Sequence, residues 1–126
     1  MKRTERWRPW HFIAASSCIF RRNTLVEEDW KYIIISTVGN YRPGWKLDTI
    51  WCERHYETMV FIWQKRWEYI DIDVSKQIYD MPLFWIEITL KNESYVDNEA
   101  NDMHETNVEY VMNNFEECYV RWMEEN

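Results

Sequence analysis

Glycine and proline are scarce in this chain, with two glycines and three prolines among 126 residues. Gly39 and Gly44 cannot form a glycine-rich phosphate-binding loop, and the chain also lacks a G-x-S-x-G nucleophile motif, a Walker pattern and a Cys–His dyad. These absences argue against an ordinary nucleotide-dependent enzyme. They also leave no flexible linker, and a chain of this length is expected to form one domain.

Cysteine and long apolar runs are sparse as well. The three cysteines, at positions 18, 52 and 118, form no C-x-x-C pair and leave an odd one over, which favours reduced thiols in a cytosol. No apolar run approaches the roughly 20 residues that span a bilayer. Residues 11–20 make a poor signal peptide because they include His and Ser residues. We therefore expect a soluble intracellular protein without membrane contact.

Aromatic residues and charge, by contrast, are abundant. Nine Trp and eight Tyr provide large apolar area with polar tips, which suits a core and also a binding surface. Residues 1–66 contain twelve Lys/Arg and seven Asp/Glu, whereas residues 67–126 contain three and fifteen. If the fold keeps these halves on different surfaces, the molecule is strongly dipolar and its field steers partners.

The most strand-like stretch is residues 55–63. Aromatic and β-branched residues dominate it, and both faces are mostly apolar, which predicts a central strand covered on both sides. Glu57 is the exception among these residues. It either reaches water at the strand end or lines a pocket at the edge of the sheet.

Further strands are predicted on both sides of this stretch. Residues 31–38 include a β-branched run, residues 67–73 alternate as the partner of a hairpin, and residues 82–90 alternate after Pro82. Residues 74–80 are ambiguous and suggest one helical turn, and residues 23–29 are interpreted as a polar connection. The loop at residues 39–54 carries a Pro-Gly turn signal with Trp45 and Trp51, and such a loop is more often functional or packed than idle.

The period changes to that of a helix from Asp102 onward. Asp102 and Glu105 imitate a capping box, after a polar loop at residues 91–99. Apolar residues then recur at steps of three and four, the stripe of an amphipathic helix: Val108, Val111, Met112, Phe115, Tyr119 and Trp122. The expected fold is α+β, with an antiparallel sheet of four to five strands and one long C-terminal amphipathic helix packed across one face.

Residues 1–29 are expected to be a basic and aromatic N-terminal arm, and residues 30–126 to hold the sheet and the helix. In the arm, Arg8 and Trp10 belong to a stretch in which basic and aromatic residues interleave. Such a pattern is used to bind single-stranded nucleic acid. The alternative is an N-terminal strand or arm whose Trp side chains pack on the domain while the Arg heads stay in water.

A spaced pattern runs through the chain: Ser36-Thr37-Val38, Tyr56-Glu57-Thr58-Met59-Val60-Phe61, Tyr95, Glu99-Ala100 and His104-Glu105. It resembles a family of small proteins of bacteriophage and prophage genomes, whose members read STV, a loop, ETMVF, a variable hairpin and an A…H helix start. The resemblance covers roughly residues 33–112, and the section at 67–90 is longer than the family pattern. It implies phage origin, hence the host cytoplasm, and a strand–strand–helix core, but no chemistry.

Two classes of function follow. The first is a phage-encoded, non-catalytic protein that binds a host protein or a small signalling nucleotide and forms a homo-oligomer through exposed strand edges. The residues expected to bind the ligand are Tyr56, Glu57, Trp45, Trp51, His104, Arg8 and Trp10. The second is a small metal-dependent hydrolase using His104, Glu57 and the carboxylates of Asp71 and Asp73, for which no recognised metal-ligand spacing exists. The favoured reading implies no catalytic residue, metal or cofactor.

Overall fold

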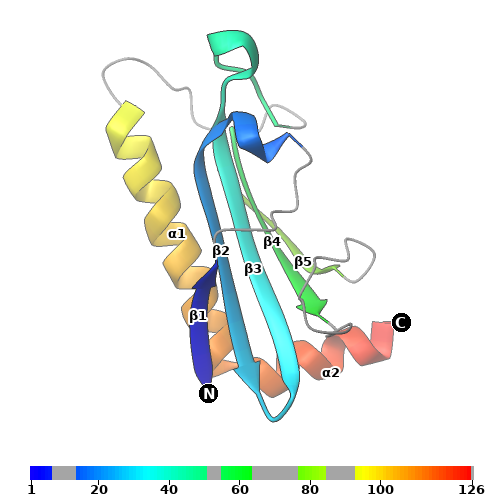
Figure 1. Cartoon of the computed structure of the whole chain (residues 1–126). Coiled ribbons are helices and arrows are strands. Elements are labelled where there is room, and N and C mark those ends of the chain that lie inside the picture. Colours follow the sequence, from blue (N-terminus) through cyan, green and yellow to red (C-terminus); the bar gives the residue numbers. More distant parts are fainter. Residues whose placement is uncertain (7–13, 51–54, 64–76, 85–92, 126) are drawn as a thin grey trace.

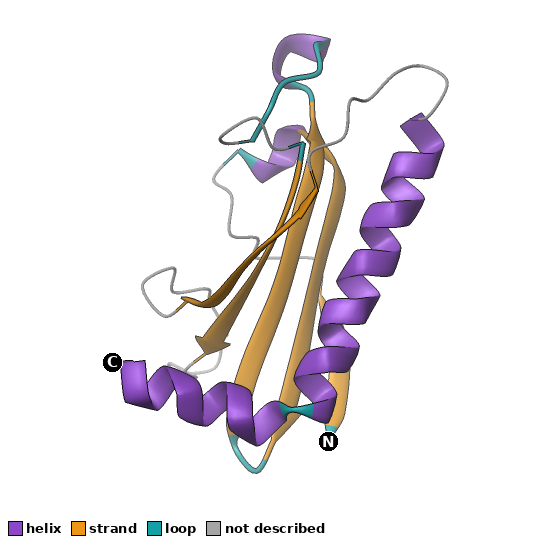
Figure 2. Cartoon of the chain, turned by 180° about the vertical axis from the view of Figure 1, so that it is seen from behind, coloured by secondary structure: helices purple, strands orange, loops and turns teal. Residues whose placement is uncertain are grey.

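The computed structural model describes residues 1–6, 14–50, 55–63, 77–84 and 93–125, with the side chains of 63, 77–84, 93–96 and 121–125 left aside. Within these residues the chain forms a five-stranded antiparallel sheet in the order β1-β2-β3-β4-β5 and two helices on one face of it (Figures 1 and 2). The expected α+β class is confirmed. The strands are β1 (Lys2–Arg6), β2 (Cys18–Glu28), β3 (Lys31–Tyr41), β4 (Tyr56–Trp63) and β5 (Gln77–Phe84); the helices are α1 (Glu93–Asn113) and α2 (Phe115–Glu125).

The centre of the sheet is the long hairpin of β2 and β3. Its two-residue turn consists of Asp29 and Trp30, both with positive φ, of 50° and 66°. Two positive φ values define a type I′ turn, whose twist matches that of the strands but which favours Asn or Asp followed by Gly. The interpretation of residues 23–29 as a polar connection is therefore wrong for 23–28, which lie in β2. Asn23 and Thr24 are polar but fully buried in this strand, and the Thr24 hydroxyl contacts Glu5 and His104.

β4 is confirmed as a central strand, since β3 and β5 pair with it on its two sides. Residues 77–80 continue as β5, so the helical turn suggested there is wrong. Pro82 lies inside β5, which is tolerated because β5 is an edge strand among the described residues. The predicted hairpin partner at residues 67–73 lies outside the described residues.

The single long helix is observed as two. α1 begins at Glu93, nine residues before the expected start, so Asp102 and Glu105 lie within the helix and form no capping box. The chain bends at Asn114, whose side-chain amide donates to the carbonyl of Tyr110 at 2.9 Å, and α2 then crosses the lower end of the sheet (Figure 2). Side chains that bond to nearby backbone in this way often bend helices.

The main core lies between the helices and the sheet. The expected stripe supplies its helical side, and the sheet supplies β-branched residues that are fully buried. Each such side chain contributes roughly 1.5–3 kcal/mol on burial. The members are Val26, Ile33, Ile35, Val60, Ile62, Val108, Val111, Phe115 and Cys118, with Met112 and Tyr119 partly buried at the margin. The other sheet face is buried too, at Leu25, Ile34 and Phe61.

The N-terminal part of the chain belongs to the sheet. β1 pairs with β2 along Lys2–Arg6, and basic side chains of the first half of the chain form ion pairs with carboxylates of the helices: Arg3 and Arg22 with Glu105, and Lys31 with Glu116. The charges of the two halves therefore interleave at these contacts and are not kept on separate surfaces. Among the described residues, no helix is long and apolar enough to cross a membrane.

Candidate functional site

His104 is the centre of a buried polar cluster between α1 and the sheet. Its side chain is fully buried. Its Nε2 lies 2.7 Å from the Thr24 hydroxyl on β2, and its Nδ1 lies 2.6 Å from the Thr37 hydroxyl on β3. The Thr37 hydroxyl lies 2.7 Å from that of Thr58 on β4, and Thr24 reaches Glu5 on β1 at 2.6 Å. These five residues, here called the His104 network, tie one helix to four strands.

The direction of every hydrogen bond in the His104 network follows from an ionised Glu5 and a neutral His104 ring. An ionised carboxylate only accepts, so the Thr24 hydroxyl donates to it and must accept from His104, which places the ring proton on Nε2. The Nδ1 atom of a neutral ring then accepts from Thr37, and Thr37 accepts from Thr58. Neutral His104 with its proton on Nε2 satisfies all four contacts.

The surroundings of His104 and Glu5 hold the imidazole neutral and the carboxylate ionised. Burial lowers the pKa of His104 to about 4, and the positive charge of Arg22 acts in the same direction. Burial acts to raise the pKa of Glu5, but hydrogen bonds from Arg22 and Thr24 outweigh it and the pKa is lowered. At neutral pH the imidazole is therefore uncharged and the carboxylate ionised.

An outer layer of ion pairs closes the cluster. Arg22 donates to both oxygens of Glu5 at 2.9 Å and to Glu105 at 2.6 Å, and Arg3 donates to both oxygens of Glu105 at 2.6 Å. Hydrogen bonds from Arg3 and then Arg22 lower the pKa of Glu105 to about 2. Bidentate pairs of this kind fix geometry as well as charge. The arrangement locks β1, β2 and α1 together and leaves His104 no free ring nitrogen for a ligand.

Tyr56 forms a second joint between sheet and helix. Its ring covers Gly39 on β3, where an added Cβ would lie 2.0 Å from the Tyr56 Cδ1 atom, so only glycine fits. The Tyr56 hydroxyl donates to Asp97 of α1, and Phe20 meets the ring edge to face at 6.0 Å. Tyr56 is completely buried.

Glu57 points to the other face of the sheet. Its neighbours Tyr56 and Thr58 both contact the helix side, so alternation places Glu57 on the opposite side, beside Val38. His104 and Glu57 therefore cannot share a metal ion. No group of three or more His, Cys, Asp or Glu side chains is arranged to hold a metal in the part of the chain that the structure describes. Asp71 and Asp73 lie outside that part.

The described cysteines are also poor nucleophiles. Cys18 and Cys118 are buried, and neither belongs to a disulfide. Burial raises the pKa of Cys18 to about 11, so its thiol stays protonated at neutral pH. Neither His104 nor the two described thiols offer accessible chemistry.

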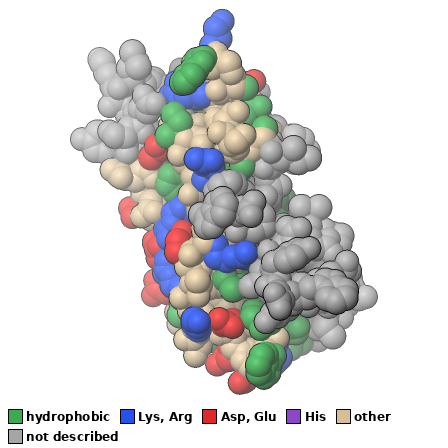
Figure 3. Space-filling view, in the orientation of Figure 1, with side chains coloured by type: hydrophobic (Ala, Val, Ile, Leu, Met, Phe, Trp, Pro, Cys, Tyr) green, Lys and Arg blue, Asp and Glu red, His purple; other side chains and the backbone are tan. Residues whose placement is uncertain are grey.

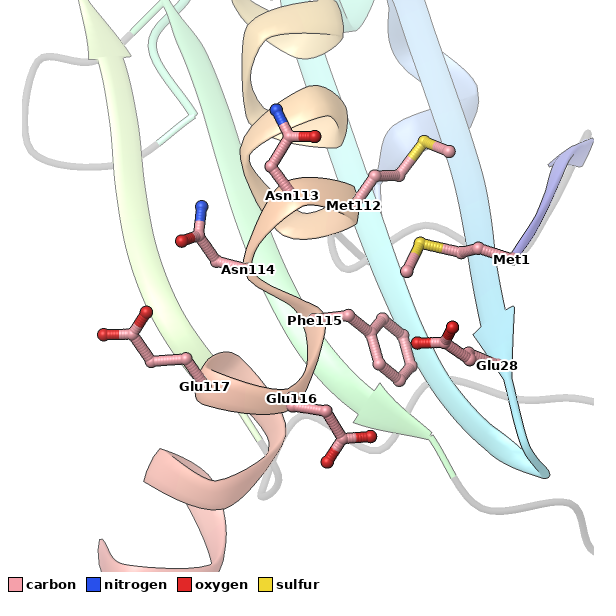
Figure 4. A pocket seen from close by; sticks show the side chains of 8 residues that line it. All are labelled: Met1, Glu28, Met112, Asn113, Asn114, Phe115, Glu116 and Glu117. Carbon is pink, nitrogen blue, oxygen red and sulfur yellow. The ribbon is translucent and has the colours of Figure 1, made fainter.

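The exposed features lie at the two ends of the molecule. At the lower end in Figure 1, Trp30 in the β2–β3 turn is 88% exposed. A pocket of about 320 Å³ lies near the α1–α2 bend, where Met1, Met112 and Phe115 converge (Figure 4). Carboxylates surround the pocket and the turn: Glu27, Glu28, Asp29, Glu116 and Glu117. We call these five residues and Trp30 the acidic tip.

Among the described residues, two lysines are paired with the acidic tip. Lys31 donates to both oxygens of Glu116 at 2.8 and 3.0 Å, and Lys2 lies 3.9 Å from Glu27. Glu28, Asp29 and Glu117 form no salt bridge with a described residue. The space-filling view shows red side chains at this lower end beside blue and green ones, and red and blue side chains in alternation along the left edge (Figure 3).

Of the residues that the sequence singled out as ligand-binding, the four that the structure describes do not come together in one site. Those in the core are Tyr56, Glu57 and His104; Trp45 is 93% exposed at the upper end; and Trp51, Arg8 and Trp10 lie outside the described residues. The acidic tip was missed. An Asp-Trp pair between two strand patterns was the available signal, but the strand before it was not predicted.

The comparisons with known proteins add no relative. A scan against protein-family models, a search of curated proteins and a search of solved structures each return no match to this chain.

Proposed function

We propose that this chain is a non-catalytic binding protein of phage origin, whose acidic tip docks on a basic surface of a host protein. The observation that carries the proposal is Trp30. It is almost fully exposed at the end of the central hairpin, in a left-handed backbone conformation that a bulky residue rarely adopts. Strained backbone of this kind persists mainly where function requires it.

The surroundings of Trp30 define the partner. Carboxylates outnumber lysines at the acidic tip by five to two. Such a field attracts basic surfaces and repels phosphate groups, so it favours a protein over a nucleotide or a nucleic acid at this end. A Trp side chain that enters a pocket of the partner is the kind of anchor that dominates binding energy.

The same evidence weighs against catalysis. His104 has both ring nitrogens in internal hydrogen bonds, and its fully buried side chain holds the helix to the sheet. Of the arm that was considered for nucleic acid, residues Lys2–Arg6 are a strand, and the Arg3 guanidinium is paired with Glu105. Neither feature is free to serve a substrate or a phosphate backbone.

The experiment is a comparison of variants on one captured partner. C-terminally tagged protein is incubated with a bacterial lysate, and the retained proteins and small molecules are identified by mass spectrometry. The wild type is expected to retain a basic protein that Trp30→Gly and the pair Glu28→Lys/Glu117→Lys release. The matched control Trp45→Ala, which removes an equally exposed Trp from the other end, should retain it.

Binding to the purified partner should weaken with salt, because the contact is electrostatic at its rim. Equal retention by all variants would refute the assignment of the acidic tip. A nucleotide as the retained molecule, with no protein, would refute the proposal itself.

A further inference from the structure

The loop at residues 42–48 presents Trp45 at the upper end of the molecule (Figure 1). The loop is internally hydrogen-bonded: the amide of Asp48 donates to Tyr41 at 2.8 Å, and that of Trp45 donates to Arg42 at 3.2 Å. Trp45 has a φ of 69° and is 93% exposed. A Cβ placed on Gly44 would meet nothing within 4 Å, so the loop projects into open space. A hydrogen-bonded turn therefore holds the Trp45 indole in solvent.

The charge of this loop is opposite to that of the acidic tip. Lys46 follows Trp45 directly and is exposed, and Arg42 precedes the Pro-Gly pair, its Nε donating to Asn40 at 2.8 Å. Asp48 at the base of the loop is the one carboxylate within residues 42–48. An exposed aromatic ring flanked by two cations is therefore offered at one end of the molecule.

The pocket at the other end has matching features. Its volume of about 320 Å³ is at the small end of the range of ligand sites. Met1 and Met112 supply flexible thioether side chains, which pack well against aromatic rings. Glu28 and Glu117 lie at its edge without a salt bridge to a described residue. The pocket suits an indole beside positive charges.

We propose that the occupant of this pocket is a second copy of the chain, which inserts Trp45 there and places Lys46 and Arg42 against Glu28 and Glu117. Because the two surfaces lie at opposite ends of one molecule, the contact is heterologous and head-to-tail. Copies joined end to end in this way leave one unoccupied pocket and one unoccupied Trp45 at the two ends of the row, so the assembly can lengthen.

The sequence predicted a homo-oligomer through pairing of exposed strand edges. The edge strand β1 is poorly suited to such pairing. That edge is only five residues long and carries Lys2, Arg3 and Arg6, and short, basic edges discourage pairing. Self-association through Trp45 uses Glu28 and Glu117 of the acidic tip, so a second copy and the proposed host partner compete for the same carboxylates. Assembly is tested with purified protein alone, and its failure leaves the proposed function standing.

The test is sedimentation velocity at low salt over a hundredfold range of protein concentration. The wild type should grow to dimers and longer species, and these should shrink as salt is raised. Trp45→Ala and the double variant Glu28→Lys/Glu117→Lys should each be monomeric. Ile19→Ala is the matched control, since it removes an exposed apolar side chain at the same end as Trp45, and it should assemble like the wild type.

Mixing the two monomeric variants gives the decisive result. Trp45→Ala keeps an intact pocket, and the double variant keeps an intact Trp45, so an equimolar mixture should form a dimer and nothing larger. Wild type that stays monomeric at every concentration would overturn the proposal. Assembly that survives in either variant alone would overturn it as well, because the contact would then lie elsewhere.

Discussion

Replacing Trp30 with glycine should strengthen the fold while it removes binding. A non-glycine residue in the left-handed backbone region destabilises the fold by roughly 1–2 kcal/mol, and glycine avoids this strain. Glycine also destabilises the folded state by about 0.4–1 kcal/mol, because it gives the unfolded chain more conformational freedom. The indole is 88% exposed, so its removal forfeits little buried area. The net expectation for Trp30→Gly is a gain of about 0.5–1 kcal/mol in the free energy of unfolding.

The assay is urea unfolding followed by tryptophan fluorescence, with partner binding measured on the same preparations. The midpoint should rise for Trp30→Gly at an unchanged slope, since the surface exposed on unfolding is nearly the same. Trp30→Ala is the control. It also loses the indole but keeps a Cβ and hence the strain, so its stability should stay within about 0.5 kcal/mol of the wild type. Both variants should lose the partner.

Two outcomes would contradict this reasoning. A Trp30→Gly variant less stable than the wild type would show that the indole contributes to the fold. A variant that is more stable yet binds the partner normally would show that the strained turn is not retained for binding, and the acidic tip would lose its anchor.

Three further predictions concern the core. Gly39→Ala should cost about 1–3 kcal/mol in urea unfolding, because a Cβ would meet the Tyr56 ring at 2.0 Å, and a wild-type midpoint would contradict this close approach. Thr37→Val should lower the free energy of unfolding by about 1–3 kcal/mol, because it leaves His104 and Thr58 without their shared hydroxyl. Thr58→Val should then cost much less in the Thr37→Val background than in the wild type. Equal costs in the two backgrounds would exclude a hydrogen bond between the two threonines. Burial lowers the pKa of His104 from 6.5 to about 4, so the unfolded chain binds more protons than the folded one between these pH values. The free energy of unfolding should therefore fall by on the order of 3 kcal/mol as the pH drops from 6.5 to 4. The variant His104→Gln should show a smaller fall over this range, and an unchanged fall would contradict the assignment to His104.

The sequence predicted the elements whose burial is apolar and periodic. β4 was found because aromatic and β-branched residues cover both of its faces, and the stripe of Val108, Val111 and Phe115 does pack on the sheet. In these segments the apolar residues recur with the period of the element and face the core, so the sequence pattern alone predicts the element.

The missed elements are those held by polar contacts. β2 buries Asn23 and Thr24, and its outward alternation therefore does not show in the sequence. The first turns of α1 have no apolar stripe, and they are joined to the sheet by Asp97, which accepts from Tyr56, and by Asn101, which accepts from Arg22 at 2.9 Å. Polar residues predict loops by default, and only the tertiary partner reverses that expectation.

The acidic tip could not be predicted for a related reason. Glu28 and Glu117 lie 89 positions apart in the sequence, and the fold brings them to the edge of one pocket. The strain at Trp30 depends on a type I′ turn that exists only if β2 and β3 pair in the observed register. Both features require the topology, which no local pattern contains.

Four of the residues that carry the resemblance to phage proteins also join helix to sheet. Thr37 comes from the STV segment, Thr58 from the YETMVF segment and His104 from the helical segment, and the three are connected in one chain of hydrogen bonds. Tyr56 adds the bond to Asp97. A pattern built from these positions specifies an architecture, because each change would leave a buried polar partner unsatisfied. It places no demand on Trp30, Trp45 or the carboxylates at the ends of the molecule. Binding specificity is then free to differ between proteins that share the pattern.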